Sequence, residues 1–135
     1  MISRTKLKVR YAETDQMGVV HHATYLVWFE AARIDFLDVA ELSYREVERR
    51  GIFLPVVEAK ATFRRPAHFG DSVVIHTRIG EIRSRGARFE YEVEREEGEL
   101  LLARGYTEHV AVDLDRRSVP IPGFLKDRLE WAKHH

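Results

Sequence analysis

The sequence predicts an α+β fold in which a curved antiparallel β-sheet wraps around one long central α-helix. The first observation is the segment at residues 23–40, ATYLVWFEAARIDFLDVA, which carries apolar side chains on nearly every helical face; such a helix is normally buried. The second is that the strand-like runs follow one another without helices between them, unlike the βαβ alternation of a parallel sheet. Because the chain has 135 residues, we expect a single domain over residues 1–135.

A first strand is predicted over residues 6–11, KLKVRY, where basic and apolar side chains alternate with the period of a half-buried strand. No apolar segment of the signal-peptide type follows this basic start, so the cytoplasm is the expected location. The long helix comes next. Charged residues in its second half argue for the protein interior and against insertion into a membrane; they are Glu30, Arg33, Asp35 and Asp38.

A short second helix is predicted directly after the long one. Ser43 and Glu46 have the spacing of a capping box, and Gly51 follows at the position of a C-terminal glycine. A long helix that is apolar all round needs more cover than one small sheet gives. We therefore expect a second copy of the chain to supply the remainder, in a homodimer or homotetramer.

Four more strands complete the predicted sheet. The clearest is the run at residues 85–96, in which apolar and charged side chains alternate, as in a strand with one face in the core. Gly98 predicts the turn into the last long run, and Gly105 within that run is a candidate β-bulge. A turn and a terminal helix are expected beyond Pro120. The strand-like runs lie near residues 53–64, 72–82, 85–96 and 99–115.

Composition excludes several functional classes. Lys+Arg and Asp+Glu balance at 22 each and the isoelectric point is near 7.1, so no global field favours nucleic acid or an anionic membrane. There is no cysteine, which removes thiol nucleophiles, cysteine-ligated zinc and disulfides. No serine lies in a G-x-S-x-G motif, so a serine hydrolase of that type is also excluded.

The composition also bears on the source of the protein. Charged residues make up 33% of the chain, arginine far outnumbers lysine and asparagine is absent. These biases are typical of a heat-adapted protein from a thermophile, in which ion-pair networks and the loss of deamidation-prone residues raise the melting temperature. A GC-rich genome produces much the same bias, so both explanations stay open.

The loop before the long helix carries an unusual concentration of reactive groups. The stretch from Tyr11 to Arg33 reads YAETDQMGVVHHATYLVWFEAAR, and the motifs FRRPAHFGD at 63–71 and HVAVDLDRR at 109–117 follow it. Together they resemble the hotdog-fold acyl-CoA thioesterases of the 4-hydroxybenzoyl-CoA thioesterase type, and most closely the bacterial branch associated with the Tol-Pal system. The resemblance covers nearly the whole chain.

The resemblance implies an enzyme that hydrolyses acyl-CoA to a free acid and CoA. Residue by residue, it makes Asp15 the catalytic carboxylate, places His22 at the start of the central helix, and matches Tyr11 to the tyrosine that accompanies them. Gly18, Val19 and Tyr25 in the same block are assigned to substrate binding. It further implies homodimers or homotetramers of hotdog subunits, active sites at the dimer interface, and no metal or other cofactor.

Physical chemistry supports the same site. A thioester carbonyl becomes an oxyanion on attack, and free N–H groups at a helix N-terminus stabilise negative charge. The backbone N–H of His22 is the candidate donor, and Gly18 allows the tight turn that brings Asp15 to it. Asp15 alone fits a turn or capping aspartate equally well, and the imidazole of His22 has three candidate tasks: orienting Asp15, holding water or protonating the leaving sulfur.

The nucleotide of CoA needs a local basic site. Arginine forks suit phosphate oxygens, and Arg64 and Arg85 are the candidates, with Ser84 as a hydrogen-bond partner. Three rival functions remain at this stage. A metal hydrolase is disfavoured because adjacent His21 and His22 do not present two rings to one ion; an acyl-carrier-protein thioesterase would share the phosphopantetheine arm; and a non-enzymatic acyl-CoA binding protein would not need Asp15.

Overall fold

The computed structural model describes residues 1–135 and contains one five-stranded antiparallel sheet with three helices. Its elements are β1 (Ser3–Lys8), α1 (Thr24–Val39), α2 (Tyr44–Arg49), β2 (Val56–Phe63), β3 (Ser72–Ile82), β4 (Gly86–Arg95), β5 (Leu100–Val110) and α3 (Gly123–His134), with 3₁₀ turns at Tyr11–Glu13 and Glu97–Glu99.

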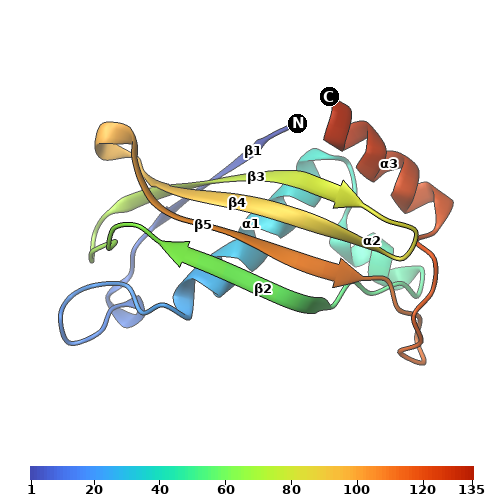
Figure 1. Ribbon diagram of the computed structural model, residues 1–135, viewed down its shortest axis with the longest axis horizontal. Coiled ribbons are helices and arrows are strands. Elements are labelled where there is room, and N and C mark those ends of the chain that lie inside the picture. Colours follow the sequence, from blue (N-terminus) through green and yellow to red (C-terminus); the bar gives the residue numbers. More distant parts are fainter.

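The strands are arranged in the order β1-β3-β4-β5-β2, and all four neighbouring pairs are antiparallel. The helix α1 runs across one face of the sheet and the other face is open (Figure 1). Strands β1 and β2 are the two edges. The predicted fold, a curved antiparallel sheet around one long helix, is confirmed.

The sequence located most elements correctly but misplaced two features. The first strand begins earlier than predicted and ends at Lys8, so Tyr11 lies beyond it in a 3₁₀ turn. The alternation itself was correct, because Leu7 and Val9 face inward beside exposed basic residues. The bulge in β5 is at Leu102, which the register of β4 and β5 skips, and the pairing passes through Gly105 without interruption.

Gly105 is required for a different reason. A Cβ atom at this position would lie 2.6 Å from the ring of Phe29 on α1 and 2.4 Å from the carbonyl oxygen of Lys60. The ring of Phe29 instead stacks on Tyr91 of the neighbouring strand, with 4.3 Å between ring centroids. The glycine therefore allows α1 to approach the centre of the sheet closely.

Only one side of α1 is covered by the sheet of its own chain. Tyr25, Trp28, Phe29, Phe36 and Leu37 are buried on that side. On the other side several apolar side chains are exposed, namely Leu26, Val27, Ile34 and Val39. The expectation of a helix buried on every face is therefore not met within one chain.

None of the helices has both the length and the hydrophobicity that a membrane-spanning helix requires.

A buried chain of hydrogen bonds lies between α1 and the sheet. His109 Nδ1 is 2.9 Å from the carbonyl oxygen of Leu54, which can only accept, so Nδ1 carries the proton. The other ring nitrogen then accepts from Thr107 at 2.8 Å, and Thr107 in turn accepts from Tyr91 at 2.7 Å. Arg33 donates to the Tyr91 oxygen at 3.4 Å. Each hydroxyl in this series of hydrogen bonds therefore has one defined acceptor.

The buried hydrogen bonds of His109 predict how the stability of the protein depends on pH. Burial, with a contribution from the charge of Arg33, lowers the pKa of His109 from 6.5 to about 4. Between these two pKa values the unfolded protein binds a proton at His109 and the folded protein does not. The contribution of His109 to the free energy of unfolding is therefore fully present above pH 6.5 and is lost as the pH falls towards 4. We expect a loss of about 2 kcal/mol between pH 7 and pH 5. Urea unfolding at both values should show it, and His109→Gln should lack this part of the pH dependence.

Candidate active site

Asp15 closes a five-residue turn with both its backbone and its side chain. Its N–H donates to the Val19 carbonyl at 2.8 Å, and its carbonyl accepts from the Gly18 N–H at 3.1 Å. Its Oδ1 accepts from the N–H groups of Met17 at 2.8 Å and Val19 at 3.3 Å. The second carboxylate oxygen, Oδ2, has no hydrogen-bond partner within the chain and the side chain is exposed.

The turn depends on Gly18 and is fixed to the loop that precedes β3. Gly18 has φ +77°, a conformation that side chains disfavour, and nothing lies near its Cβ position. The predicted tight turn at Gly18 is confirmed. Val19 forms a β-bridge with His68, and the Val20 N–H donates to the Ala67 carbonyl at 2.9 Å. The loop at residues 66–71 thus supports the whole turn.

The two histidines lie directly before α1, and their roles differ. His21 belongs to the scaffold: its N–H donates to the Glu13 carbonyl at 2.9 Å, and its Nδ1 accepts the Ala23 N–H at 3.2 Å. The ring of His22 is exposed and stacks on that of His21, with centroids 4.2 Å apart. The backbone N–H of His22 has no hydrogen-bond acceptor in the chain. An unpaired N–H at a helix start is a donor that can stabilise negative charge.

Tyr11 lies in the 3₁₀ turn before Asp15 and is 78% exposed. Its ring meets Phe69 edge to face, with centroids 5.6 Å apart. The prediction that Tyr11 ends the half-buried first strand was therefore wrong. The tyrosine is on the loop surface together with two other exposed apolar side chains, Met17 and Phe69.

Sequence reasoning missed Glu13. This carboxylate is buried, with 8% of the residue exposed, and accepts hydrogen bonds from the Arg10 N–H at 2.8 Å and the Trp28 indole N–H at 2.9 Å. Burial acts to raise the pKa of Glu13, but the hydrogen bonds from Arg10 and Trp28 lower it overall. The sequence shows an acidic residue two positions before Asp15 and a tryptophan on the buried helix. Nothing in their spacing predicts that these two side chains form a hydrogen bond.

Besides Gly18, three of the candidate substrate-binding residues lie in or near this loop. Val19 is part of the turn. Tyr25 is 3% exposed and packs against Trp28 and Phe63, with 5.0 Å between ring centroids in both pairs. Arg64 directly follows Phe63 at the end of β2, is exposed and forms no ion pair within the chain. Its guanidinium is therefore free to bind an anion on the same side as the turn.

Ser84 and Arg85 lie elsewhere in the same chain. They form the turn between β3 and β4, whereas the Asp15 turn rests on the residues that precede β3. Because β3 is 11 residues long, the two sites are about 35 Å apart along the sheet. Arg85 donates to the Ser118 carbonyl at 2.8 Å. One chain alone does not bring these two residues to Asp15.

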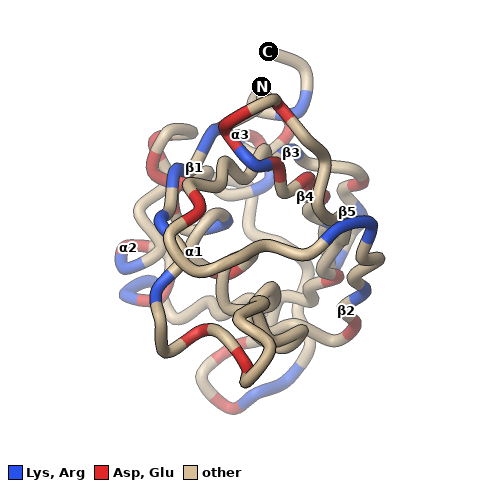
Figure 2. The backbone as a smooth tube through the Cα atoms, turned by 90° about the vertical axis from the view of Figure 1, so that its left-hand side faces the viewer, with Lys and Arg blue, Asp and Glu red and all other residues tan.

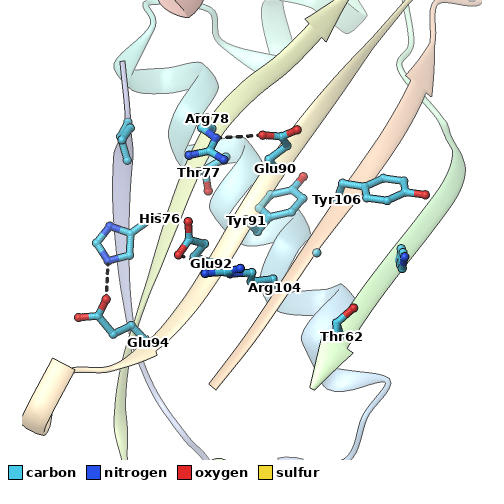
Figure 3. Close-up of a pocket in the computed structure, with 13 residues that line it drawn as sticks. Thr62, His76, Thr77, Arg78, Glu90, Tyr91, Glu92, Glu94, Arg104 and Tyr106 are labelled. Atoms are coloured by element: carbon cyan, nitrogen blue, oxygen red, sulfur yellow. Dashed lines mark hydrogen bonds and ion pairs between the residues drawn. The ribbon is translucent and has the colours of Figure 1, made fainter. Parts of the chain in front are cut away.

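A hollow of about 630 Å³ is also separate from this loop. It lies over the middle strands, and its charged side chains pair across neighbouring strands (Figure 3). The pairs are Arg78 with Glu90 at 2.9 Å, His76 with Glu94 at 3.5 Å and Arg104 with Glu92 at 4.0 Å. Acidic and basic residues are interspersed in the same way over the rest of the chain (Figure 2). Thr77 also lines this hollow, and its buried Oγ1 has no hydrogen-bond partner.

The loop combines two features that suit hydrolysis of a carbonyl compound. A carboxylate oxygen without a partner can attack the carbonyl carbon or activate a water molecule. A backbone N–H without an acceptor at the start of a 16-residue helix can stabilise the oxyanion that results. Because the hydrogen bonds of the turn use Oδ1, Oδ2 is the carboxylate oxygen of Asp15 that is left without a partner.

Comparison with known proteins identifies similar chains across the whole fold. The thioesterase-like superfamily matches residues 9–129. A Bacillus subtilis protein named "Putative acyl-CoA thioesterase YneP" is 36% identical over 112 residues, which are 83% of this chain and 80% of that protein.

Two solved structures are also similar. A hypothetical protein from Thermus thermophilus has 52% identity and a TM-score of 0.91, covering 96% of this chain and 98% of that one. A 1,4-dihydroxy-2-naphthoyl-CoA thioesterase from Synechocystis has 28% identity and a TM-score of 0.87, with 96% of both chains covered.

Proposed function

Because the chain belongs to the thioesterase-like superfamily and is a thioester hydrolase, we propose that it hydrolyses an acyl-CoA to the free acid and CoA. The observation that carries this proposal is the pairing, in one loop, of the free Oδ2 of Asp15 with the unpaired N–H of His22. The relatives with CoA thioesters in their names support the choice of substrate class. The finer kinship, with the 4-hydroxybenzoyl-CoA type and its Tol-Pal-associated branch, is part of the proposal, as is a single domain over residues 1–135.

In the proposed mechanism, Asp15 acts through Oδ2 by one of two routes. It attacks the acyl carbon to give a mixed anhydride that water then cleaves, or it removes a proton from a water molecule that attacks directly. In both routes the carbon–sulfur bond breaks and CoA leaves as a thiolate. Oδ1 keeps its two hydrogen bonds to Met17 and Val19 throughout, so the carboxylate stays fixed in the turn.

The leaving group explains why few other residues are needed. A thiol has a pKa of about 8.5 by analogy with cysteine, so the thiolate departs near neutral pH without a strong acid. The exposed imidazole of His22 can orient the carboxylate, hold the water or protonate the sulfur. The exposed phenol of Tyr11 stands four residues before Asp15 and is proposed to assist at the same site.

We propose a homodimer as the smallest active unit, with a homotetramer as the larger alternative. Strand β2 is an edge strand of eight residues, and seven of them are exposed. Together with the uncovered apolar face of α1, this edge suits pairing with β2 of a second copy. Antiparallel pairing about a two-fold axis would also bring Ser84 and Arg85 of the partner subunit to the end of the sheet where Asp15 lies, next to Arg64 for binding CoA phosphates.

The proposal is tested by a panel of thioesters with short-chain, long-chain and aryl acyl groups. We expect release of free CoA from at least one group of acyl-CoAs. The released thiol is measured through its reaction with a chromogenic disulfide. Faster turnover of an acyl group on acyl-carrier protein than on CoA would identify the carrier as the protein. Tight binding of acyl-CoA without any hydrolysis would contradict the enzyme and favour the binding protein.

Turnover is expected to need no added cofactor. Asp15 has the free oxygen that the reaction requires, and the chain presents no cluster of three or more side chains suited to a metal ion. Dialysis against EDTA should therefore leave kcat unchanged. A loss that a divalent metal restores would overturn the mechanism.

A further inference from the structure

Glu13 touches both parts of the proposed site without belonging to either. Its carbonyl accepts the N–H of His21 at 2.9 Å, and His21 directly precedes the residue whose N–H is free. Its carboxylate accepts the indole N–H of Trp28 at 2.9 Å, which lies in the second turn of α1. Its position in the chain is two residues before Asp15. The residue thus connects the strand end, the catalytic turn and the start of the helix.

The carboxylate is held by three donors, and two of them come from Arg10. The Arg10 N–H donates to Oε1 at 2.8 Å, and the Arg10 guanidinium lies 3.4 Å from Oε2, which also receives the Trp28 indole N–H. Trp28 is 3% exposed, so its N–H has no access to solvent as an alternative partner. Both oxygens of Glu13 therefore act as acceptors, and only an ionised carboxylate provides two acceptors at these positions.

From this geometry we infer that Glu13 is a positioning residue for the thioesterase reaction. Its carboxylate fixes the catalytic loop to α1 through Trp28, and its carbonyl fixes the helix start through His21. The distance between Oδ2 of Asp15 and the N–H of His22 is set by these two links, because each group lies only one or two residues from a linked position. This inference rests on the proposed function, since it assigns a role in placing the two groups of that mechanism.

The decisive variant is Glu13→Gln. It has the same shape, but its NH₂ group must face either the Arg10 N–H or the Trp28 indole N–H. One of these two hydrogen bonds is then lost, and two N–H donors face each other in its place. A displacement of the loop by a fraction of an ångström is expected to lower kcat by about tenfold or more, since small errors in placement are costly. KM should remain within about twofold of the wild-type value, because Glu13 contacts no substrate.

A second variant removes the other partner of the link. Trp28→Phe keeps an aromatic ring in the core and deletes only the indole N–H, so kcat should fall in the same direction with KM unchanged. The indole proton of Trp28, identified in NMR spectra by its loss in this variant, should shift in Glu13→Gln. The double variant should have a kcat close to that of Glu13→Gln alone, because both changes break one link. If Glu13→Gln does not fold, Trp28→Phe alone decides.

Glu108 provides a matched control. It is another buried carboxylate, 7% exposed, and it pairs with Arg83 at 2.7 Å and Arg88 at 2.5 Å, at the opposite end of the sheet from the Asp15 loop of its own chain. Glu108→Gln should lower the melting temperature and leave kcat unchanged. A folded Glu13→Gln protein with wild-type kcat, or an equal loss of kcat in Glu108→Gln, would overturn the inference. If Asp15→Asn keeps wild-type turnover, the proposed function of the loop itself fails, whichever result Glu13 gives.

Discussion

Replacing Asp15 by asparagine is expected to lower kcat for acyl-CoA hydrolysis by about a hundredfold or more, the range for loss of a positioned base or nucleophile. The structure makes this substitution unusually clean. The amide oxygen of asparagine can take the place of Oδ1 and accept the same N–H groups of Met17 and Val19. The NH₂ group then occupies the position of Oδ2, so only the reactive oxygen and the charge are lost.

The chain contains a matched control for this experiment. Asp113 forms the same turn: its Oδ1 accepts from the N–H groups of Asp115 at 2.9 Å and Arg117 at 3.0 Å, and its own N–H donates to the Arg117 carbonyl at 3.0 Å. This turn follows β5, at the end of the sheet away from the Asp15 loop (Figure 1). Asp113→Asn should therefore match the structural effect of the substitution and keep the wild-type kcat. Arg85 of the proposed CoA site donates to the Ser118 carbonyl beside this turn, so any functional effect should be on KM.

The comparison separates a catalytic aspartate from a structural one. If Asp15 only shaped its turn, Asp15→Asn and Asp113→Asn would both change the melting temperature slightly, by the equivalent of about 1 kcal/mol or less, and both would remain active. His22→Ala adds a third point. It removes the imidazole and leaves the backbone N–H, so its loss of kcat should be smaller than that of Asp15→Asn.

Local sequence signals predicted the elements whose cause is local. The alternation in β4, the Ser43 cap of α2 and the positive φ of Gly18 each depend on a few neighbouring residues, and each was found from the sequence. The equivalent turn at Asp113 was not, because Arg116 has φ 62° in the place where Gly18 has φ 77°. A glycine indicates a left-handed residue, but an arginine in the same conformation leaves no signal.

Features that depend on the arrangement of the sheet and helix could not be predicted from the sequence. The link between Glu13 and Trp28 joins residues that are 15 positions apart, and no periodicity relates them. Gly105 was interpreted as a bulge because the need for space comes from Phe29 on a distant helix. For the same reason, the sequence grouped Arg85 with Arg64 as candidates for binding the CoA nucleotide, whereas the length of β3 separates Arg85 from the Asp15 loop within one chain.

The second large effect is expected from a charge on the edge strand β2. Val57 is 59% exposed and lies on the free edge strand, where the pairing of β2 with β5 is irregular between Val56 and Glu58. In a two-fold pairing of β2 with its copy, Val57→Asp introduces two like charges into an apolar contact. Self-association should weaken by about a hundredfold or more. The residue contacts neither Asp15 nor the turn that holds it.

Light scattering and turnover, measured on the same samples over a range of concentrations, test this prediction. Wild-type protein should have at least twice the chain mass of 15.8 kDa, and Val57→Asp should dissociate to the single chain and lose activity in proportion, since the partner subunit is proposed to complete the CoA site. Leu114→Asp is the matched control for association, because Leu114 is 75% exposed but lies in the loop after β5; it should leave both the mass and kcat unchanged. A wild-type chain that is monomeric and fully active at micromolar concentration would show that the exposed side of α1 and the free edge of β2 have another purpose.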